Sequence, residues 1–372
     1  MREILRCCIL ISFLIFFFST SDKACAAEGA LPLTADAAVL IDYQTGTVLY
    51  GSNATRPLPP ASTTKILAGL LSLEIGDGKD TVIIDNYTAS VEGTSIYLKS
   101  GQILSLRDLT KGALINSGND AATAIAIHLA GNEQQFASLM NYKAKTVGCW
   151  QSRYYNPHGL PQVGHAVSAY DMARITRYAL KNKNFRCIVS TRSDRIRDAS
   201  GKVIKLYNTN RLLGHRERGI EVVGVKTGTT SEAGECLVAA ANVKGQLLIS
   251  VVLGSSNRYA DTLRLFEFGA KECHSVQIRR NTPCFQVPVW RGSQSEVAAG
   301  PEEDISVVVP TNQLPLLEKR VYLEPYLRAP CAKGSRVGRM EIVLGNNLLY
   351  STELITLQDI SKRCFSIKKG FR

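Results

Sequence analysis

Pro60-Ala61-Ser62-Thr63-Thr64-Lys65 is the segment around which the rest of this sequence can be organised. Three prolines, at positions 57, 59 and 60, interrupt regular structure just before Ser62. Apolar side chains then recur at helical spacing from Ile66 until the chain reaches Gly76. The pattern predicts a buried helix that begins at Ser62 and carries Lys65 one turn further along the same face.

This spacing is suited to nucleophilic chemistry. A serine hydroxyl is a weak nucleophile at neutral pH and needs a base within hydrogen-bonding reach, which the amine of Lys65 can supply to Ser62. Burial and a second nearby cation would lower the pKa of Lys65 and keep its amine neutral. The free N–H groups at the start of a helix would also suit an oxyanion. The alternative is a capped helix with an exposed lysine.

A second triplet, Ser117-Gly118-Asn119, lies between helices that we predict for residues 106–115 and 119–129. Ser117 could pass a proton between a leaving group and Lys65. Asn119 could hold the Lys65 amine and a substrate carbonyl through the two ends of its amide. An ordinary turn between two helices is the alternative interpretation.

A third triplet, Lys226-Thr227-Gly228, follows a strand that we predict for residues 221–225. Lys226 is the natural second cation for lowering the pKa of Lys65. Lys226 and Thr227 together offer a cation and a hydroxyl to a substrate carboxylate, and Gly228 would let a substrate backbone approach the strand closely. The three triplets therefore predict one cavity around a nucleophilic serine.

The order of elements predicts an α+β fold with two domains. Strand patterns come early and late, with helices between them, which describes one layered domain over residues 28–272. From Cys273 to residue 357, short strand-like pieces and turn residues predict a small C-terminal β-rich domain. The remaining predicted elements are a hairpin at 37–42 and 47–50, helices at 168–180 and 259–271, strands at 235–242 and 247–253, and β segments at 287–290, 306–309, 320–323 and 340–344. Residues 185–215 are too mixed to assign.

The first residues of the chain indicate export, and the last residues indicate possible membrane contact. Arg2 and Arg6 precede the apolar run 7–18, and small residues follow at 24, 26 and 27, so residues 1–27 are typical of a cleaved secretory signal. The last 15 residues, 358–372, have apolar side chains at helical spacing and basic side chains elsewhere. They predict a short amphipathic helix that could lie on an anionic membrane, or else a solvated tail.

The net charge and the cysteine content limit the partners and ligands that we expect for this chain. Residues 1–27 hold three of the 44 basic and two of the 32 acidic side chains, so the mature net charge falls from +12 to +11. Anionic partners in a cell wall or at a membrane surface would suit that charge, and an ordinary solvated surface is the alternative. The sequence contains no nucleic-acid-binding motif. Seven cysteines remain, without the spacing of a zinc site, and we expect mostly buried thiols with at most two disulfides. We expect no metal and no cofactor.

The chain resembles the serine D-Ala-D-Ala carboxypeptidases, which are the low-molecular-mass penicillin-binding proteins. The resemblance spans roughly residues 37–271 and rests on segments 60–65, 117–122, 156–160, 226–230 and 233–234. It implies a β-lactamase/transpeptidase-like domain, with an antiparallel sheet flanked by helices. It also implies that Ser62 forms an acyl-enzyme with the penultimate D-Ala of a peptidoglycan stem pentapeptide, expels the terminal D-Ala and is released by water. Penicillins and other β-lactams would acylate the same serine.

The same resemblance implies further roles and leaves rivals open. The oxyanion hole would be the backbone N–H groups of Ser62 and Thr229, and Arg258 would lie near the terminal carboxylate of the substrate, unless it is a surface arginine. His158 is expected to be structural. A β-lactamase of the same fold would need a glutamate-bearing loop, and the chain contains no Glu-x-x-Leu-Asn. A non-catalytic wall-binding or β-lactam-sensing module is the other alternative.

Overall fold

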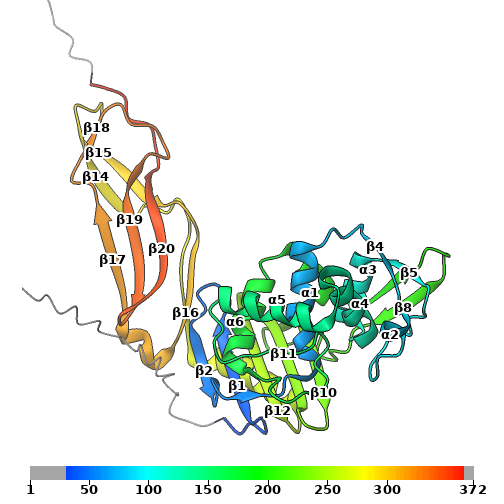
Figure 1. The fold of residues 1–372 in the computed structure, drawn as a ribbon. Helices are drawn as coiled ribbons and strands as arrows, with labels where there is room; N and C mark the ends of the chain where they lie inside the picture. Colours follow the sequence, from blue (N-terminus) through cyan, green and yellow to red (C-terminus); the bar gives the residue numbers. More distant parts are fainter. Residues whose placement is uncertain (1–30, 364–372) are drawn as a thin grey trace, which may run out of the picture.

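The computed structural model describes residues 31–363 of the chain. The predicted signal segment and residues 364–372 of the predicted tail lie outside that range. Figure 1 shows a wide domain of helices and strands joined to a long, narrow domain of strands. Within the described residues, no helix is both long and apolar enough to cross a membrane.

A six-stranded antiparallel sheet forms the centre of the larger domain. Its first two strands are the predicted hairpin, and the first strand pairs with a strand more than 200 residues later, from Ala37 opposite Leu253 to Asp42 opposite Leu248. The sheet therefore joins the beginning and the end of the domain. In sheet order its strands are β2 (Val48–Ser52), β1 (Ala37–Asp42), β12 (Gln246–Ser255), β11 (Gly234–Val243), β10 (Ile220–Thr230) and β9 (Arg216–Glu217).

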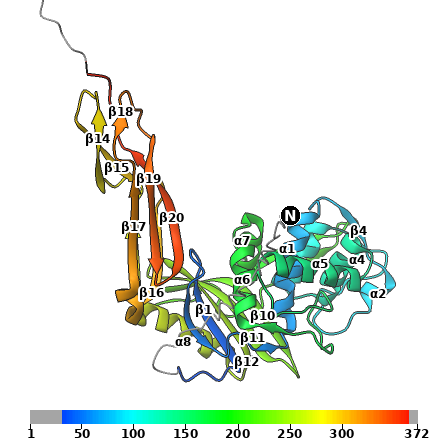
Figure 2. The ribbon, with the colours of Figure 1, turned by 60° about the vertical axis from the view of Figure 1, so that its left-hand side comes forward.

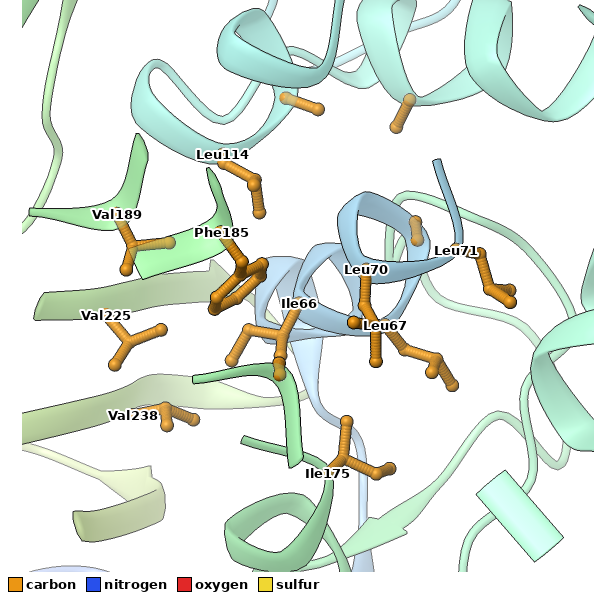
Figure 3. Close-up of a cluster of buried hydrophobic side chains, with 14 of the residues drawn as sticks. Ile66, Leu67, Leu70, Leu71, Leu114, Ile175, Phe185, Val189, Val225 and Val238 are labelled. Carbon is orange, nitrogen blue, oxygen red and sulfur yellow. The ribbon is translucent and has the colours of Figure 1, made fainter. Parts of the chain in front are cut away.

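Helices cover both faces of this sheet (Figures 1 and 2). Side chains alternate across strand β1, so that Val39 and Ile41 pack in the larger helical core while Ala38 and Leu40 pack against the last helix. Figure 3 shows the larger core, where Ile66 lies among side chains of other helices and of the sheet. The larger layer contains α1 (Lys65–Ile75), α3 (Leu106–Ile115), α4 (Asn119–Ala130), α5 (Glu133–Thr146), α6 (Ala169–Ala179) and α7 (Lys183–Val189), and the other face carries α8 (Arg258–Glu272).

Local capping explains where several of these helices begin and end. The hydroxyl of Ser105 accepts a hydrogen bond from the N–H of Asp108, which fixes the start of α3 at the predicted residue. Ser168 caps α6 in the same way, so the predicted helix there begins one residue later than expected. Helix α4 ends at Gly131, whose φ of 81° continues the chain in the left-handed region.

Short elements complete the larger domain. The region that the sequence pattern left unassigned contains most of α7 and a two-stranded ribbon, and further strands pair two by two elsewhere in the domain. These elements are β3 (Pro57–Leu58) with β6 (Val167–Ser168), β4 (Thr81–Ile83) with β5 (Ile103–Ser105), β7 (Ser193–Arg197) with β8 (Val203–Tyr207), the 3-10 helix η1 (Ala61–Thr64) and α2 (Asn86–Ala89).

The C-terminal domain is built from strands around a core of its own, which includes Val287, Val297 and Leu354. The four predicted β segments all lie in its strands. Its larger sheet has the order β17 (Leu317–Leu323), β19 (Arg336–Leu344), β20 (Asn347–Thr356), β15 (Glu296–Pro301), β14 (Phe285–Trp290) and β18 (Leu327–Arg328). A separate ribbon pairs β13 (Cys273–Ile278) with β16 (Ile305–Pro310), and the 3-10 helix η2 (Thr311–Leu316) follows it.

The tail prediction is wrong for residues 358–363. No helix forms there; instead Ile360 bridges to Cys331, and Lys362 bridges to Gly292. Ile360 is only 2% exposed because its side chain completes the core of the β domain. An apolar residue that we assigned to a membrane-facing helix therefore belongs to a folded core.

Cysteine burial also differs from the prediction. The six cysteines within residues 31–363 are free thiols, but only Cys149 and Cys236 are buried, whereas Cys187 and Cys284 are exposed. The described thiols are thus not mainly core residues.

Candidate active site

The turn that carries Ser62 precedes helix α1. Residues 61–64 form the 3-10 helix η1, and the α-helix begins only at Lys65. The Thr63 hydroxyl donates to the carbonyl of Pro60 at 2.7 Å, which ties the turn to the preceding proline segment. Ser62, where we predicted the α-helix to begin, therefore lies in a tight turn before the observed start at Lys65. The Lys65 amine nevertheless lies 2.9 Å from the Ser62 hydroxyl oxygen.

The Lys65 amine is fully buried among hydrogen-bond acceptors. It donates to Asn119 Oδ1 at 2.7 Å and to the backbone carbonyl of His158 at 2.8 Å. Burial lowers the pKa of Lys65 well below its usual range, and the charge of Lys226 lowers it further. A neutral amine has two N–H groups and one lone pair. The two carbonyl oxygens take both N–H groups, which leaves the lone pair to accept the proton of Ser62.

The second triplet forms the turn between α3 and α4. Ser117 is buried and has a φ of 66°, so the backbone reverses there in the left-handed region. Asn119 is held on both sides, because its N–H donates to the carbonyl of Thr94 and its Nδ2 donates to the carbonyl of Glu92, both at 2.7 Å. These bonds turn its Oδ1 toward Lys65. In the described part of the chain, the Ser117 hydroxyl has no hydrogen bond to Lys65.

The third triplet lies inside strand β10, beside the serine turn. Lys226 is 1% exposed, and its amine donates to the carbonyl of Thr227 at 3.0 Å. Burial lowers its pKa to about 7, and the charge of Arg258 contributes. The Thr227 hydroxyl lies 2.6 Å from that of Thr209. A Cβ on Gly228 would lie 2.8 Å from the backbone nitrogen of Ser62, so only glycine lets the strand run this close to the turn.

Arg258 is part of the same assembly. It is the first residue of α8, and its Nη1 donates to the carbonyl of Gly228 at 2.8 Å and to the hydroxyl of Thr229 at 2.6 Å. Its side chain is 14% exposed, and its Nε lies 4.0 Å from a carboxylate oxygen of Glu235. The surface-arginine alternative is therefore wrong. Arg258 holds the end of β10 and adds positive charge beside Lys226.

Two residues outside the three triplets, His158 and Glu133, support Lys65. His158 supplies its backbone carbonyl to the Lys65 amine, and its ring nitrogen Nδ1 accepts the N–H of Leu160 at 3.2 Å. The other ring nitrogen, Nε2, lies 3.3 Å from Glu133 Oε1, which also accepts the hydroxyl of Thr123 at 2.5 Å. Burial lowers the pKa of His158, so a neutral ring with its proton on Nε2 satisfies both contacts.

The loop that carries His158 fits closely against the serine turn. Gly159 has a φ of 87°, and a Cβ there would lie 1.8 Å from the carbonyl oxygen of Ala61. The predicted structural role for His158 therefore covers only its ring. A glycine after His158 was the available signal in the sequence, but a backbone carbonyl has no side-chain signature.

Comparison with known proteins gives the family. The profile of the family described as D-alanyl-D-alanine carboxypeptidase matches residues 23–257, and a profile for the C-terminal domain of penicillin-binding protein 5 matches residues 277–362. The carboxypeptidase DacF of Bacillus subtilis is 34% identical over 96% of this chain and 93% of its own length. DacC of Escherichia coli is 33% identical over 95% and 91%.

Solved structures agree with this result. Penicillin-binding protein 5 of Haemophilus influenzae has a TM-score of 0.67 at 28% identity, and the match covers 90% of this chain and all of that one. A regulatory factor of peptidoglycan synthesis from Streptococcus pneumoniae, with a TM-score of 0.75 at 24% identity over 89% of this chain and all of that one, supports the fold alone. The predicted fold class, with its separate C-terminal β domain, is confirmed. The chain belongs to the D-alanyl-D-alanine carboxypeptidase family, and it is a serine-type carboxypeptidase of the penicillin-binding protein group.

Proposed function

We propose that Ser62 is the nucleophile of this carboxypeptidase and that neutral Lys65 is its base. The observation that carries the proposal is the set of three contacts to the Lys65 amine, which directs its lone pair to the Ser62 hydroxyl. The substrate class is the peptidoglycan stem pentapeptide. The reacting carbonyl belongs to the penultimate D-Ala, and the leaving group is the terminal D-Ala.

The reaction then proceeds in two steps, acylation of Ser62 and hydrolysis of the acyl-enzyme. The Ser62 proton moves to the Lys65 amine while Oγ bonds to the carbonyl carbon of the penultimate D-Ala. The bond from that carbon to the nitrogen of the terminal D-Ala breaks, and the leaving amine takes the proton by way of Ser117. Water next attacks the ester, gives a proton back through Lys65 to Ser62, and releases the shortened peptide. Ser117 is assigned to this transfer because its turn directly precedes Asn119, which contacts Lys65.

Binding of the substrate is assigned to β10. The backbone N–H groups of Ser62 and Thr229 would bind the oxyanion, and the fit of Gly228 against the Ser62 nitrogen supports this placement. Lys226 and Thr227 would bind the terminal carboxylate, with Arg258 adding to the positive potential. A cavity of about 410 Å³ next to the end of this strand, lined in part by Pro60, Leu160 and Thr230, offers room for the peptide.

The test is release of free D-Ala from a stem pentapeptide by the purified protein. Ser62→Ala should abolish the release. Ser138→Ala, which removes a serine hydroxyl from the exposed side of α5, should leave it unchanged. D-Ala release that survives Ser62→Ala would remove Ser62 from its role. Mass spectrometry after treatment with penicillin should show a persistent adduct on the wild type and none on Ser62→Ala; rapid loss of that adduct would favour β-lactamase activity.

We also propose an extracytoplasmic site of action, at the cell wall or the outer face of the cytoplasmic membrane. Residues 1–27 would act as the secretory signal, 28–272 as the peptidase domain and 273–357 as the β domain, with the tail contacting anionic lipid. Because Ile360 belongs to the β core, the part of the tail left for a membrane is 364–372. Close to the bridge between Gly292 and Lys362, the side chain of Trp290 is 48% exposed. The guanidinium carbons of Arg291 and Arg328 lie 4.2 Å and 5.2 Å from the centroid of its ring.

Deletion of residues 364–372 tests that contact and keeps every core residue of the described range, Ile360 included. Flotation with vesicles that contain phosphatidylglycerol should recover the full mature chain and lose most of the truncated one, whose melting temperature should not change. Equal flotation of both would reject the tail as the attachment segment.

A further inference from the structure

A second cavity, of about 480 Å³, lies away from Ser62 at the ends of helices α5 and α6. The turn between β1 and β2 forms another of its walls through Thr45 and Gly46. None of the residues assigned to catalysis or substrate binding lines this cavity. The cavity is therefore distinct from the proposed carboxypeptidase site.

Four cationic side chains line the cavity, and no aspartate or glutamate does. They are Lys145 at the end of α5, Arg174 and Arg177 on α6, and Lys181 just after α6. Within residues 31–363, none of the four forms an ion pair. Such a concentration of positive charge in a hollow attracts anions.

The backbone fixes the position of one arginine. Arg177 donates through Nε to the carbonyl of Tyr43 at 2.7 Å and through Nη2 to the carbonyl of Gln44 at 2.5 Å. A Cβ on Gly46, whose φ is 80°, would lie 3.2 Å from Nη1 of this arginine. The guanidinium is thus held in one orientation, and Nη1 is left for a ligand.

The second arginine, Arg174, lies beside Gly148 and the Tyr170 ring and has its donors free. A Cβ on Gly148, whose φ is 79°, would lie 2.3 Å from Nη2 of Arg174, so a glycine is required for the guanidinium to lie where it does. The guanidinium carbon also lies 5.6 Å from the centroid of the Tyr170 ring. The described residues give this half-buried side chain no hydrogen-bond acceptor.

The helix dipoles and the nearby carboxylates do not neutralise all four positive charges. Cations near helix C-termini stabilise the helix dipole, and that effect applies to Lys145 and Arg177. The buried carboxylates of Asp42 and Asp171 lie near the arginines, but Asp42 already accepts from Thr45, and Asp171 from Ser152 and the N–H of residue 151. Even if both carboxylates are ionised, they neutralise only two of the four cations, and the cavity keeps a net positive charge.

We propose that this cavity binds a phosphate group of a polyanionic ligand. The planar guanidinium fork matches the oxygen atoms of a phosphate, and lysines at the rim add attraction without demanding a fixed geometry. At the extracytoplasmic location proposed above, on which this inference rests, a basic protein can meet phosphate in two forms, as a soluble phosphodiester polymer or as a lipid headgroup. Both forms present the same phosphate oxygens to the cavity.

The experiment compares two variants of the full mature chain that each lose two positive charges. Arg174→Gln/Lys181→Gln alters the cavity, and Arg197→Gln/Lys99→Gln alters exposed side chains outside it. Calorimetric titration with tripolyphosphate measures binding of soluble phosphate, and flotation with phosphatidylglycerol vesicles measures headgroup binding. We expect the cavity variant to bind at least one probe about tenfold more weakly than the wild type, and the control variant to stay within about twofold.

The pattern of loss identifies the ligand source. Weaker binding of tripolyphosphate indicates a soluble phosphate, whereas weaker flotation alone indicates a headgroup. D-Ala release should be unchanged in both variants. If Arg174→Gln lowers the melting temperature, Lys145→Gln/Lys181→Gln replaces it, because both lysines are exposed. Equal weakening in cavity and control variants, or no difference from the wild type with either probe, would overturn the proposal.

Discussion

Replacing Gly228 with alanine is expected to slow the acylation of Ser62 severely while leaving the protein folded. The added Cβ would lie 2.8 Å from the backbone nitrogen of Ser62 and 3.0 Å from the carbonyl oxygen of Pro60, whereas ordinary contact begins near 3.4 Å. Strand β10 and the serine turn must therefore separate by about 0.5 Å. The displaced groups are the proposed oxyanion donors and the nucleophile itself.

The size of the effect follows from the loss of these donors. Removing one oxyanion-hole donor costs about 100- to 1000-fold in rate, or roughly 3–4 kcal/mol of transition-state stabilisation. The rate of covalent labelling by a fluorescent penicillin, measured under single-turnover conditions, gives the acylation step directly. Gly78→Ala is the matched control, because the nearest atom to its Cβ would be the Cβ of Arg107 at 3.4 Å, which is an ordinary contact. Acylation of Gly228→Ala within about threefold of the wild type would refute the predicted fit between strand and turn.

Three further predictions concern the site and the core that supports it. Burial lowers the pKa of Lys226 to about 7, so its amine is charged below that pH and neutral above it. The KM for a peptide with a free carboxylate should therefore rise as the pH increases through 7. A KM that does not change with pH would show that Lys226 does not bind the carboxylate. Glu133→Ala should lower kcat about tenfold with little change in KM, because the His158 ring loses its partly buried acceptor. Glu133→Gln should retain most activity through its amide oxygen, and equal losses in the two variants would contradict this. Ile66→Ala should reduce the free energy of unfolding by about 2–5 kcal/mol in urea denaturation, because the side chain is fully buried in the core shown in Figure 3, and a loss below about 1 kcal/mol would be inconsistent with that packing.

Fold prediction succeeded where a local signal and a buried face coincide. Helix α3 runs over the predicted residues because Ser105 caps it and its apolar side chains face the core. The ribbon of β7 and β8 escaped prediction because each strand buries a single side chain, Ile196 and Leu206. Helix α5 was missed because its fully buried positions include two alanines beside Phe136 and Met140, which is a weak periodic signal.

The candidate site shows the same division. Spacing alone placed Lys65 within reach of Ser62, and this requires only local helix geometry. His158 contacts Lys65 through its backbone carbonyl, and Glu133 contacts the ring of His158. The side-chain type therefore does not indicate the role of either residue. The tail was misassigned because an apolar repeat cannot show whether Ile360 faces lipid or the core of a domain.

The contacts of Lys65 also make the reactivity of Ser62 a measure of folding. Asn119 and His158 lie 54 and 93 residues away from Lys65 in the chain, and strand β10 is more distant still. Contacts of such long range form only when the chain has closed large loops. A partly folded chain has no neutral amine beside the serine and cannot be acylated. Brief labelling with a β-lactam during refolding should therefore count only molecules that have reached the native arrangement.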